Sequence, residues 1–395
     1  MNLFTSSSSI IITCHKRIAP YLEKEVLELG FAVDETFITG VKLTGTINDC
    51  IKLNLNLRCA SQVLYSLQQF TATDADEIYN HLKDYAWENI LPDPGYFSVT
   101  SNVSNPTINN SMFANLRVKD AIVDRLRDKR GTRPTTGSEL TGTVIHLFWK
   151  NEDAEIFIDT SGDSLARHGY RKIPGLAPML EGLAAATIYA TGWDRVSPFI
   201  NPMCGSGTLA IEAALIATNR RPGLFRTNYA FMHVQGYDET VYLKEDALLE
   251  EQIIDTPQLR IIATDYDAKA IDNAKKNAIA AGVLKLIAFN ICDFAVTEVP
   301  QEVPGVMMIN PEYGDRLGTI SELEETYSRI GDFMKQKCKG YFGYVFTGNL
   351  ELAKKIGLKA KRRIEFYNST IDCRLFEYEL YAGSKREPKE SKPEE

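Results

Sequence analysis

The chain has 395 residues, of which 44% are hydrophobic and 24% are charged, which is ordinary for a globular protein. This composition excludes a collagen, a continuous coiled coil and a wholly disordered chain. Lys and Arg number 44 against 52 Asp and Glu, so the formal net charge is -8, which excludes a uniformly basic protein that coats nucleic acid. At about 150 residues per domain, the length predicts two or three domains.

Cysteine and histidine are sparse and scattered. Only five histidines are present, no C-x-x-C pair occurs, and the seven cysteines lie far apart in the sequence. We therefore expect no metal site and no disulfide framework, and free thiols are typical of a reducing cytoplasm. The N-terminus has no positively charged n-region, and no stretch approaches the roughly 18 apolar residues of a membrane span. These features predict a cytoplasmic protein that does not bind membranes.

The first 160 residues mix short strands with helices. A β-branched run at 8–14 predicts a strand, and apolar residues at helical spacing over 16–29, followed by Gly30, predict a helix. The other predicted elements of this half are a strand at 33–43, a short amphipathic element at 50–57, a helix at 73–87, a turn at 92–95, a strand at 96–103, a helix at 111–130, and strands at 144–149 and 155–159. The order predicts α+β structure throughout this half.

A regular alternation of strands and helices begins near residue 165. The predicted strands are at 199–200, 260–264, 286–290, 306–309 and 341–346, and the predicted helices are at 180–190, 209–218, 268–281 and 322–338. The alternation predicts a doubly wound parallel sheet, so this half is α/β. Such sheets bind ligands at the carboxyl ends of their strands. The last residues, 384–395, are charged and proline-rich and predict a disordered tail.

A glycine turn, Gly205-Ser206-Gly207, lies between the first of these strands and a helix. Glycines let backbone N–H groups approach a ligand closely, although a tight turn without a ligand and a relaxed dinucleotide-binding loop have the same pattern. Asp265 ends the next strand, where a carboxylate would accept from ribose hydroxyls. Asp293 ends the strand after that, where it would accept from an adenine amino group. The three strand ends predict an adenosine-binding rim; Asp265 as a plain helix N-cap is the alternative.

The segment Asn310-Pro311-Glu312-Tyr313 follows a further strand and indicates a reaction. The exocyclic amine of a base is a poor nucleophile, because its lone pair is conjugated into the ring. The Asn310 side-chain oxygen and the Pro311 carbonyl are spaced to accept the two amine protons and so free the lone pair. The Tyr313 ring offers a face for stacking a flipped base, worth about 1–3 kcal/mol. Since the ring face and not the hydroxyl is invoked, phenylalanine should be tolerated at 313.

Several segments resemble one known family. NPMCGSGT, TDYDAKAIDNAKKN and NPEYGDRLG are similar to the cofactor loop, the ribose-binding strand end and the catalytic loop of class I S-adenosylmethionine-dependent N-methyltransferases. HGYRKIPGLAPMLEGLAAA, NPMCGSGTLAIEAALIATNRRPGL and FYNSTIDCRLFEYEL resemble more closely the THUMP-domain rRNA guanine-N2 methyltransferases, a family often labelled as N6-adenine-specific DNA methylases. The resemblance covers about residues 5 to 382.

The resemblance implies a fold and a domain layout. A ferredoxin-like segment would occupy 1–60, a THUMP RNA-binding domain 61–160, and a Rossmann-like class I methyltransferase domain 165–383. The cofactor would be S-adenosyl-L-methionine. The residues implied to bind it are Asn201, Cys204, Gly205, Ser206, Gly207, Thr208, Asp265, Tyr266, Asp293 and Phe294. The implied catalytic residues are Asn310, Pro311, Glu312 and Tyr313, and the partner would be large-subunit rRNA, before or during ribosome assembly.

Two residues depart from the family pattern. Asn201 stands where the family usually has Asp, so it can still hydrogen-bond the methionine ammonium of the cofactor but with less charge complementarity. Glu312 stands where the family has a second Pro. Its carboxylate would accept from the N1–H and N2–H edge of guanine, whereas adenine presents an acceptor at N1. This favours guanine, although Glu312 as a solvent-facing loop residue remains open.

Three basic stretches stand out from the acidic total, at 117–133, 167–172 and 354–363. Each is either a solvated face or part of a track for RNA phosphates. The residues predicted to bind RNA are Arg117, Lys119, Arg125, Arg127, Lys129, Arg130, Arg171 and Lys172. We therefore expect the N-terminal half to supply RNA affinity and the C-terminal half to supply the chemistry.

Other functions stay open at this point. Cys204 as a nucleophile is disfavoured, because it lies in the glycine turn and no Pro-Cys dipeptide occurs. The main alternative is methylation of adenine N6 in DNA or RNA. An NAD(P)-dependent oxidoreductase would use the same glycine pattern, but no Tyr-x-x-x-Lys and no histidine beside the turn supports it. A non-catalytic RNA-binding factor is a further alternative. No motif in the sequence indicates the target nucleotide or the oligomeric state.

Overall fold

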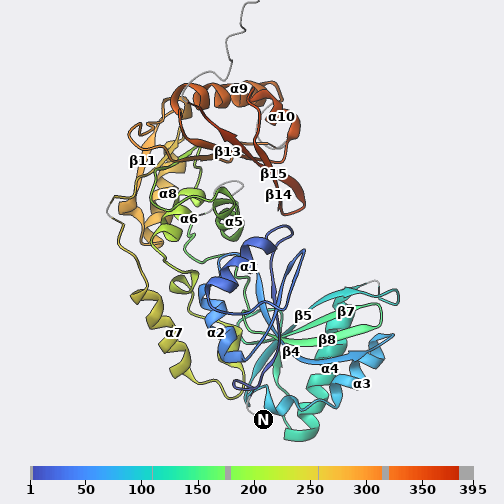
Figure 1. The fold of residues 1–395 in the computed structure, drawn as a ribbon. Helices are drawn as coiled ribbons and strands as arrows, with labels where there is room; N and C mark the ends of the chain where they lie inside the picture. Colours follow the sequence, from blue (N-terminus) through green and yellow to red (C-terminus); the bar gives the residue numbers. More distant parts are fainter. Residues whose placement is uncertain (1–2, 109, 174–178, 257, 314–319, 382–395) are drawn as a thin grey trace, which may run out of the picture. The chain divides into compact units, whose positions relative to one another are not determined.

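The computed structural model describes residues 3–381, apart from 109, 174–178, 257 and 314–319. It divides into two compact units (Figure 1), and each is described by itself. The first unit comprises Met1–Gly169 and Asn219–Ile253, and the second comprises Tyr170–Thr218 and Ile254–Glu395. The tail predicted at 384–395 lies outside the described residues. None of the described helices is long and apolar enough to cross a membrane.

The first unit is built on one eight-stranded sheet with the order β2-β3-β1-β4-β8-β7-β5-β6. Its strands are β1 (Ser8–Thr13), β2 (Glu35–Phe37), β3 (Gly40–Gly45), β4 (Gln62–Thr71), β5 (Tyr96–Ser104), β6 (Thr135–Thr136), β7 (Thr143–Lys150) and β8 (Asp153–Asp159). Its helices before residue 160 include α1 (Ala19–Glu28), α2 (Ile47–Asn56), α3 (Ala75–Lys83) and α4 (Ser111–Arg130). Because β4 pairs with β1 and with β8, it joins the two predicted α+β regions in a single sheet.

Local sequence explains where these elements begin and end. The long helix predicted at 111–130 is confirmed as α4: the Asn110 side chain accepts from the Met112 N–H, and Gly131 ends the helix with φ 73°. The helix predicted at 16–29 begins only at Ala19, because Arg17 has a left-handed backbone with φ 73° and Pro20 favours a first turn. The strand predicted at 33–43 is instead the antiparallel hairpin of β2 and β3.

A segment of the second half of the chain belongs to the first unit. Residues 219–253 lie within the range predicted for the methyltransferase domain, 165–383, but pack in the first unit. This segment holds α7 (Glu239–Glu251), which has no predicted counterpart. Tyr229 and Phe231 are fully buried, and the Phe231 N–H donates to the Thr160 carbonyl at 3.0 Å. The insertion therefore contributes to the core of the first unit.

The second unit contains a seven-stranded sheet with the order β11-β10-β9-β12-β13-β15-β14. Its strands are β9 (Phe199–Pro202), β10 (Ile261–Asp265), β11 (Ile287–Ile291), β12 (Val306–Ile309), β13 (Phe342–Thr347), β14 (Arg362–Asn368) and β15 (Ile371–Glu379). The first five are parallel, as predicted. β15 runs antiparallel to both β13 and β14, and this hairpin is not part of the predicted parallel sheet.

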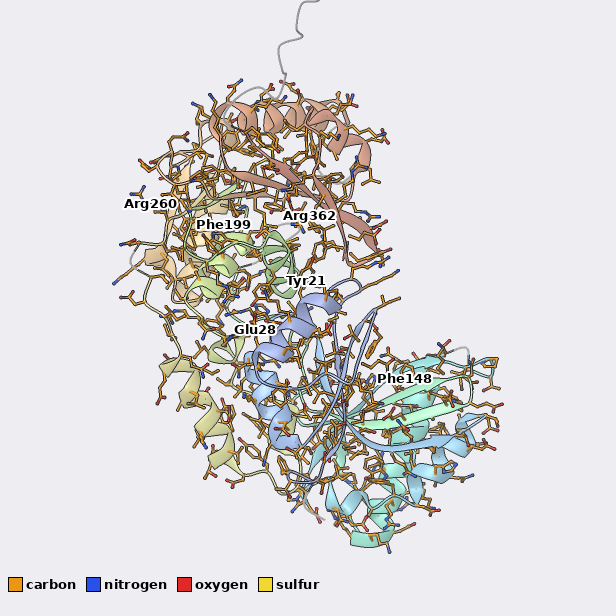
Figure 2. The ribbon with its side chains drawn as sticks, viewed as in Figure 1. Tyr21, Glu28, Phe148, Phe199, Arg260 and Arg362 are labelled. Carbon is orange, nitrogen blue, oxygen red and sulfur yellow. The ribbon has the colours of Figure 1, made fainter. Side chains whose placement is uncertain are left out.

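Helices cover both faces of this sheet (Figure 1). The helices are α5 (Glu181–Thr191), α6 (Thr208–Ala217), α8 (Ala268–Ala280), α9 (Ile320–Lys337) and α10 (Leu350–Lys355). Buried residues of α9 and α10 share one core with Met307 and Ile309 of β12. In Figure 2, Phe199 of β9 lies inside the unit, where its ring packs against Trp193 with centroids 5.1 Å apart. The sheet is therefore buried on both faces, and its strand ends remain to form a site.

Candidate active site

The strand order switches direction between β9 and β12, which are parallel neighbours in the sheet. From β9 the order continues outward through β10 and β11, and from β12 it continues the other way through β13. Open α/β sheets bind ligands outside the carboxyl ends of the strands at such a switch point. The predicted site residues Asn201, Gly205 and Asn310 follow or end these two central strands, which places the predicted cofactor turn and catalytic loop at neighbouring positions.

Two asparagine side chains at this switch point have unpartnered acceptors. Asn201 is 1% exposed and donates through Nδ2 to the Met308 carbonyl at 2.9 Å. Its Oδ1 atom, and likewise the Oδ1 atom of Asn310, is buried without a hydrogen-bond partner among the described residues. A buried acceptor left unpaired costs about 1–3 kcal/mol, so native proteins rarely keep one without a function. Both oxygens are suited to accept hydrogen bonds from ligand N–H groups.

The glycine turn requires its glycines for two different reasons. Gly207 caps α6 with φ 83°, and a Cβ there would lie 2.9 Å from the Ala274 Cβ. Gly205 has φ 55°, and a Cβ there would have no heavy atom within 4 Å. A side chain at 207 would therefore meet α8, whereas the backbone at 205 borders open space that a ligand can approach. Ser206 and Thr208 are nearly buried beside it.

Asp265 connects the glycine turn to the end of β10. Its Oδ2 accepts from the Gly205 N–H at 2.9 Å, and its Oδ1 accepts from the Asp267 N–H at 3.0 Å. The cap of α8 is Asp267, whose side chain accepts from the Lys269 N–H, so Asp265 is not the helix N-cap. Tyr266, next in the chain, is 74% exposed. The carboxylate of Asp265 keeps one further lone pair on each oxygen for a ligand.

Asp293 has an ionic partner that the sequence pattern does not reveal. Nη2 of Arg329, from α9, donates to both of its carboxylate oxygens at 2.8 Å. Burial opposes ionisation of Asp293, but hydrogen bonds from Arg329 and from the Ala295 N–H hold its pKa below the usual value. The Arg329 guanidinium also lies 4.9 Å from the centre of the Phe294 ring, and Phe294 is buried in the core. An adenine amino group would have to share Asp293 with Arg329.

The catalytic loop predicted at 310–313 is held from two sides. The Tyr327 hydroxyl of α9 donates to the Glu312 carbonyl at 3.2 Å, and the Asn368 Nδ2 of β14 donates to the Tyr313 hydroxyl at 2.8 Å. Burial, and then the negative charge of Asp265, raise the pKa of the Glu312 carboxyl. This electrostatic interaction indicates that the catalytic loop and the end of β10 face the same region.

Cys204 has the properties of a structural residue. It is buried, and burial followed by the charge of Asp265 raises the pKa of its thiol far above the usual value. The thiolate needed for nucleophilic attack is therefore strongly disfavoured. Among the described residues no group of three or more His, Cys, Asp or Glu side chains is placed to hold a metal ion.

Arg171, one of the residues predicted to bind RNA, makes its contacts within the structure beside the glycine turn. Its side chain is 11% exposed, its Nε lies 3.5 Å from Glu181 Oε1, and its Nη2 donates to Thr208 Oγ1 at 2.9 Å. Asn277 of α8 accepts from the Lys172 N–H and donates to the Ser206 carbonyl at 3.2 Å. The Arg171–Thr208 and Asn277–Ser206 hydrogen bonds both support the glycine turn. Arg171 is thus committed to the structure that supports the predicted cofactor site.

The basic residues of α4 are also largely paired within the first unit. Arg117 forms an ion pair with Asp76, Arg125 with Glu88, Arg127 with Asp124, and Lys119 with Asp120 at 3.7 Å. Arg130 donates to the carbonyls of Glu88 and Leu91. These carboxylates reduce the positive potential of the helix, so the count of basic residues in the sequence overstates it. The role of these residues in RNA binding stays a prediction.

The sheet order with its antiparallel β15, together with the glycine turn and the polar strand ends, is the arrangement of the class I methyltransferase fold that the motifs resemble. Residues 168–377 match the family described as RMKL-like, methyltransferase domain. Residues 9–64 match the RlmL ferredoxin-like domain, and residues 72–159 match the THUMP domain. The chain belongs to the RMKL-like methyltransferase family, and the predicted fold class is confirmed.

Individual relatives agree with this assignment. The chain is 37% identical over 381 residues, 93% of its length, to the "Ribosomal RNA large subunit methyltransferase K/L" of Syntrophotalea carbinolica. It covers 53% of that protein, so it spans about half the length of such curated relatives. A solved structure described as a "predicted N6-adenine-specific DNA methylase" from Listeria monocytogenes is similar with a TM-score of 0.85 and 30% identity, covering 95% of this chain and 97% of that chain.

A second solved structure carries a ligand. It is described as a "putative methyltransferase complexed with SAH", and it matches with a TM-score of 0.86 and 27% identity, covering 96% of this chain and all of that chain. The residues that sequence reasoning missed, Arg329, Tyr327, Asn277 and Asn368, lie on helices and strands far along the chain from the residues they contact. Two of them lie in segments that carry the family resemblance, Asn277 at the end of TDYDAKAIDNAKKN and Asn368 in FYNSTIDC, although neither was assigned a role.

Proposed function

We propose that this chain transfers a methyl group from S-adenosylmethionine to the exocyclic N2 amine of a guanine in large-subunit rRNA. The observation that carries the proposal is that Asn201 Oδ1 and Asn310 Oδ1, both at the switch point, are buried without a hydrogen-bond partner among the residues that the structure describes. An amine N-methyltransferase needs one acceptor for the ammonium of its cofactor and another for the amine that it methylates. The printed names of the curated relatives support rRNA as the substrate.

The cofactor assignment follows the strand ends. We assign Asn201 to the methionine ammonium and the free lone pairs of Asp265 to the ribose. Residues 204–208 form the turn that would surround the cofactor. Tyr266 and Phe294 flank these strand ends, and Asp293, shared with Arg329, is assigned to the adenine amino group. The open space beside Gly205 and the orphan oxygen of Asn201 fit such a group. Bound there, S-adenosylmethionine supplies an electrophilic methyl sulfonium.

The chain itself has to prepare the amine. The target base must leave its stack, at a cost of a few kcal/mol, before its amine can be aligned. Asn310 Oδ1 and the Pro311 carbonyl accept hydrogen bonds from the two amine N–H groups. These hydrogen bonds let the nitrogen become pyramidal and free its lone pair. The Tyr313 ring stacks on the base and recovers part of the cost. No strong general base is required, because alkylation makes the remaining proton acidic.

Guanine is favoured over adenine by Glu312. Glu312 is exposed and follows Pro311, and the raised pKa of its carboxyl, caused by burial and then by the charge of Asp265, supports a location beside the proposed site. A carboxylate accepts from the N1–H group of guanine, whereas the N1 of adenine is itself an acceptor and would repel it. The description of the Listeria relative as a predicted N6-adenine-specific DNA methylase favours adenine N6 as the second candidate. Both candidates share the same amine chemistry.

We further propose that the reaction takes place in the cytoplasm, before or during assembly of the large subunit. Seven free cysteines suit a reducing compartment, and a flipped base is most accessible in RNA that is not yet fully folded. The domains proposed for these tasks are the ferredoxin-like segment 1–60, the THUMP domain 61–160 for RNA, and the methyltransferase domain 165–383. Lys129 and Lys172 keep their proposed roles toward RNA phosphates.

The test is methyl transfer by the purified chain from labelled S-adenosylmethionine to unmodified rRNA, followed by nucleoside mass spectrometry. We expect N2-methylguanosine from the wild-type chain. Asn310→Ala should lower kcat more than it lowers RNA affinity, because the acceptor acts mainly in the transition state. Asn80→Ala, on an exposed face of α3, is the matched control.

Two results would contradict the proposal in different ways. N6-methyladenosine as the product would overturn the guanine assignment and leave the amine mechanism intact. A wild-type chain that binds S-adenosylhomocysteine and rRNA but transfers no methyl group, or an Asn310→Ala variant as active as Asn80→Ala, would overturn the mechanism itself.

A further inference from the structure

The FYNSTIDC motif contributes directly to the catalytic loop. Asn368 lies at the end of β14 and Cys373 lies on β15, and both reach the hydroxyl of Tyr313. Asn368 Nδ2 donates to this oxygen at 2.8 Å, and Cys373 Sγ lies 3.8 Å from it. The antiparallel hairpin that the parallel-sheet prediction omits is therefore what meets the stacking residue.

The ring of Tyr313 is restrained along its sides as well as at its hydroxyl. Its centroid lies 6.3 Å from that of Phe346 with an interplanar angle of 69°, an edge-to-face contact. Gly348 leaves room for the ring, since a Cβ there would lie 3.0 Å from Tyr313 Cδ2 and Cε2. These apolar contacts limit where the ring can lie, but a ring can still pivot about its χ angles. The hydroxyl contact at the far end of the side chain is the one best placed to stop that motion.

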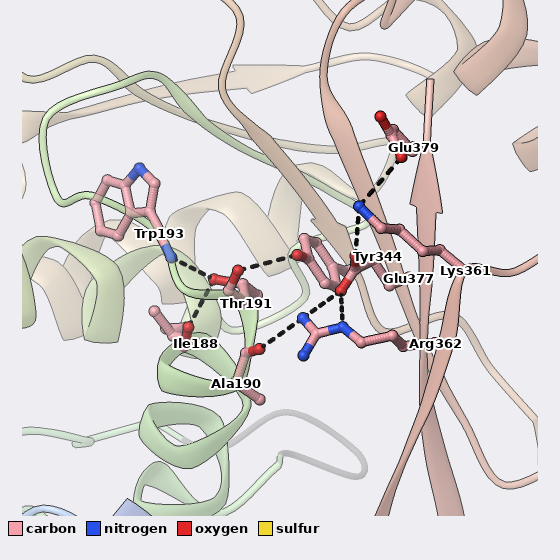
Figure 3. A network of polar contacts seen from close by, with 9 residues as sticks. All are labelled: Ile188, Ala190, Thr191, Trp193, Tyr344, Lys361, Arg362, Glu377 and Glu379. Carbon is pink, nitrogen blue, oxygen red and sulfur yellow. Dashed lines mark hydrogen bonds and ion pairs between the residues drawn. The ribbon is translucent and has the colours of Figure 1, made fainter. Parts of the chain in front are cut away.

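The hairpin that carries Asn368 is itself firmly anchored (Figure 3). Glu377 of β15 is 3% exposed and pairs with Arg362 and, at 3.9 Å, with Lys361. Arg362 also donates to the Ala190 carbonyl at the end of α5. Tyr344 of β13 donates to the Thr191 carbonyl at 3.0 Å. The network ties the hairpin to α5 at the end of β14 opposite Asn368.

We propose that Asn368 is a positioning residue for methyl transfer: by donating to the Tyr313 hydroxyl it fixes the ring plane on which the target base stacks. The proposal rests on the proposed function and deepens it. It also changes one expectation from the sequence, because the Tyr313 hydroxyl now has a task that phenylalanine cannot perform. Asn368 acts through Tyr313 and makes no contact with the reacting atoms in this scheme.

The test compares four variants of the full chain. Asn368→Leu keeps the volume but removes the donor, Tyr313→Phe removes the acceptor, and the double variant removes both. Asn368→Asp retains a contact, because the Tyr313 hydroxyl can donate to the carboxylate. Thr370→Ala, exposed at the tip of the same hairpin, is the control. Total label transferred from S-adenosylmethionine to rRNA is measured, so the identity of the methylated base does not affect the result.

We expect Asn368→Leu and Tyr313→Phe each to lower kcat about tenfold, which is about 1.4 kcal/mol and in the range of one hydrogen bond. The double variant should be no slower than Tyr313→Phe alone, because that variant already removes the hydroxyl that Asn368 contacts. Asn368→Asp and Thr370→Ala should stay within about threefold of the wild type. Affinity for S-adenosylhomocysteine should be unchanged in all of them, which a merely destabilised fold would not preserve.

The proposal is overturned if Asn368→Leu transfers methyl groups at the wild-type rate. It is also overturned if the double variant shows the product of the two single losses, about a hundredfold, because the two side chains would then act independently. Tyr313→Phe keeps the test decisive if Asn368→Leu does not fold: a wild-type rate in that variant is equally contradictory. Failure of the proposed function would appear elsewhere, in the wild-type product and in Asn310→Ala.

Discussion

The single carboxylate of Asp265 makes a specific prediction at the scale of one residue. It holds the Gly205 N–H and is also proposed to bind the ribose. Asp265→Asn should weaken S-adenosylhomocysteine binding by more than tenfold, measured calorimetrically, because a neutral amide both loosens the turn and binds hydroxyls less strongly. Asp272→Asn, in an exposed pair with Lys276 on the next helix, is the control and should bind normally. Equal affinities of the two variants would contradict the assignment.

Arg171 offers a way to separate cofactor support from RNA binding. Because its guanidinium contacts Glu181 and Thr208 beneath the glycine turn, Arg171→Gln should raise the KM for S-adenosylmethionine several-fold. RNA affinity and its salt dependence should not change, since no phosphate contact is lost. Arg260→Gln, an exposed arginine of the same unit, is the control. If Arg171→Gln reduced the salt dependence of RNA binding, Arg171 would contact RNA phosphates, as the sequence predicts.

Asp159 at the end of β8 predicts a pH dependence of stability. Burial raises the pKa of its carboxyl from 3.8 to about 6, despite hydrogen bonds from Gln62 and from the N–H groups of Ser161 and Gly162. The folded chain then binds the proton more tightly than the unfolded chain. Its contribution to stability is present below pH 3.8 and is lost as the pH rises through about 6.

The measurement is the urea midpoint of the first unit as a function of pH. Asp159→Asn, which does not titrate, should become more stable relative to the wild type as the pH rises from 4 to 7. A difference between the two midpoints that stays constant over this range would show that Asp159 has no raised pKa.

At the scale of elements, the β14–β15 hairpin depends on a buried carboxylate. Glu377 is 3% exposed and takes its main charge compensation from Arg362, with Lys361 further away. Arg362→Met should lower the unfolding free energy of the second unit by about 1–3 kcal/mol, because it leaves a buried carboxylate under-satisfied. Lys354→Met, in an exposed pair on α10, should cost no more than about 0.5 kcal/mol. Denaturant midpoints that fall equally in both would contradict this.

The helices and strands of the two units illustrate which elements a sequence can and cannot predict. The strands β9 to β13 and the long helix α4 have strong local patterns and clear caps, so they are predicted correctly to within a few residues. β4 is buried on both faces over its first half and polar over its second, so it has no regular period. The site divides in the same way: its loops and acids are local motifs, whereas Arg329 and Asn368 are defined by tertiary contacts.

For a related reason, the sequence does not reveal how the charges of the basic stretches are paired. Counting lysines and arginines over 117–133 predicts a positive surface, but most of their partners come from elsewhere in the chain, such as Asp76 and Glu88. Charge pairing between distant segments is invisible to a window of sequence. Asp120 and Asp124, both within α4, are local acids that could have been weighed against Lys119 and Arg127.

At the scale of the whole molecule, we expect that the first unit cannot fold without the insertion 219–253. It supplies the buried side chains of Tyr229, Phe231 and Leu249, and its His233 carbonyl accepts from Thr143 Oγ1 at 2.6 Å. A fragment of residues 1–160 lacks all of these. Losing even one buried aromatic side chain costs about 3–5 kcal/mol, which is a large part of the stability of an average domain.

We therefore expect the 1–160 fragment to unfold without cooperativity and to show weak RNA binding for that reason alone. A fragment in which 1–169 is joined by a flexible linker to 219–253 should restore a cooperative transition, followed by near-UV circular dichroism during urea unfolding. If the first unit provides RNA affinity, the joined fragment should bind rRNA with a strong salt dependence that the full chain shares. A 1–160 fragment that unfolds as cooperatively as the joined one would show that the insertion is dispensable for the first unit.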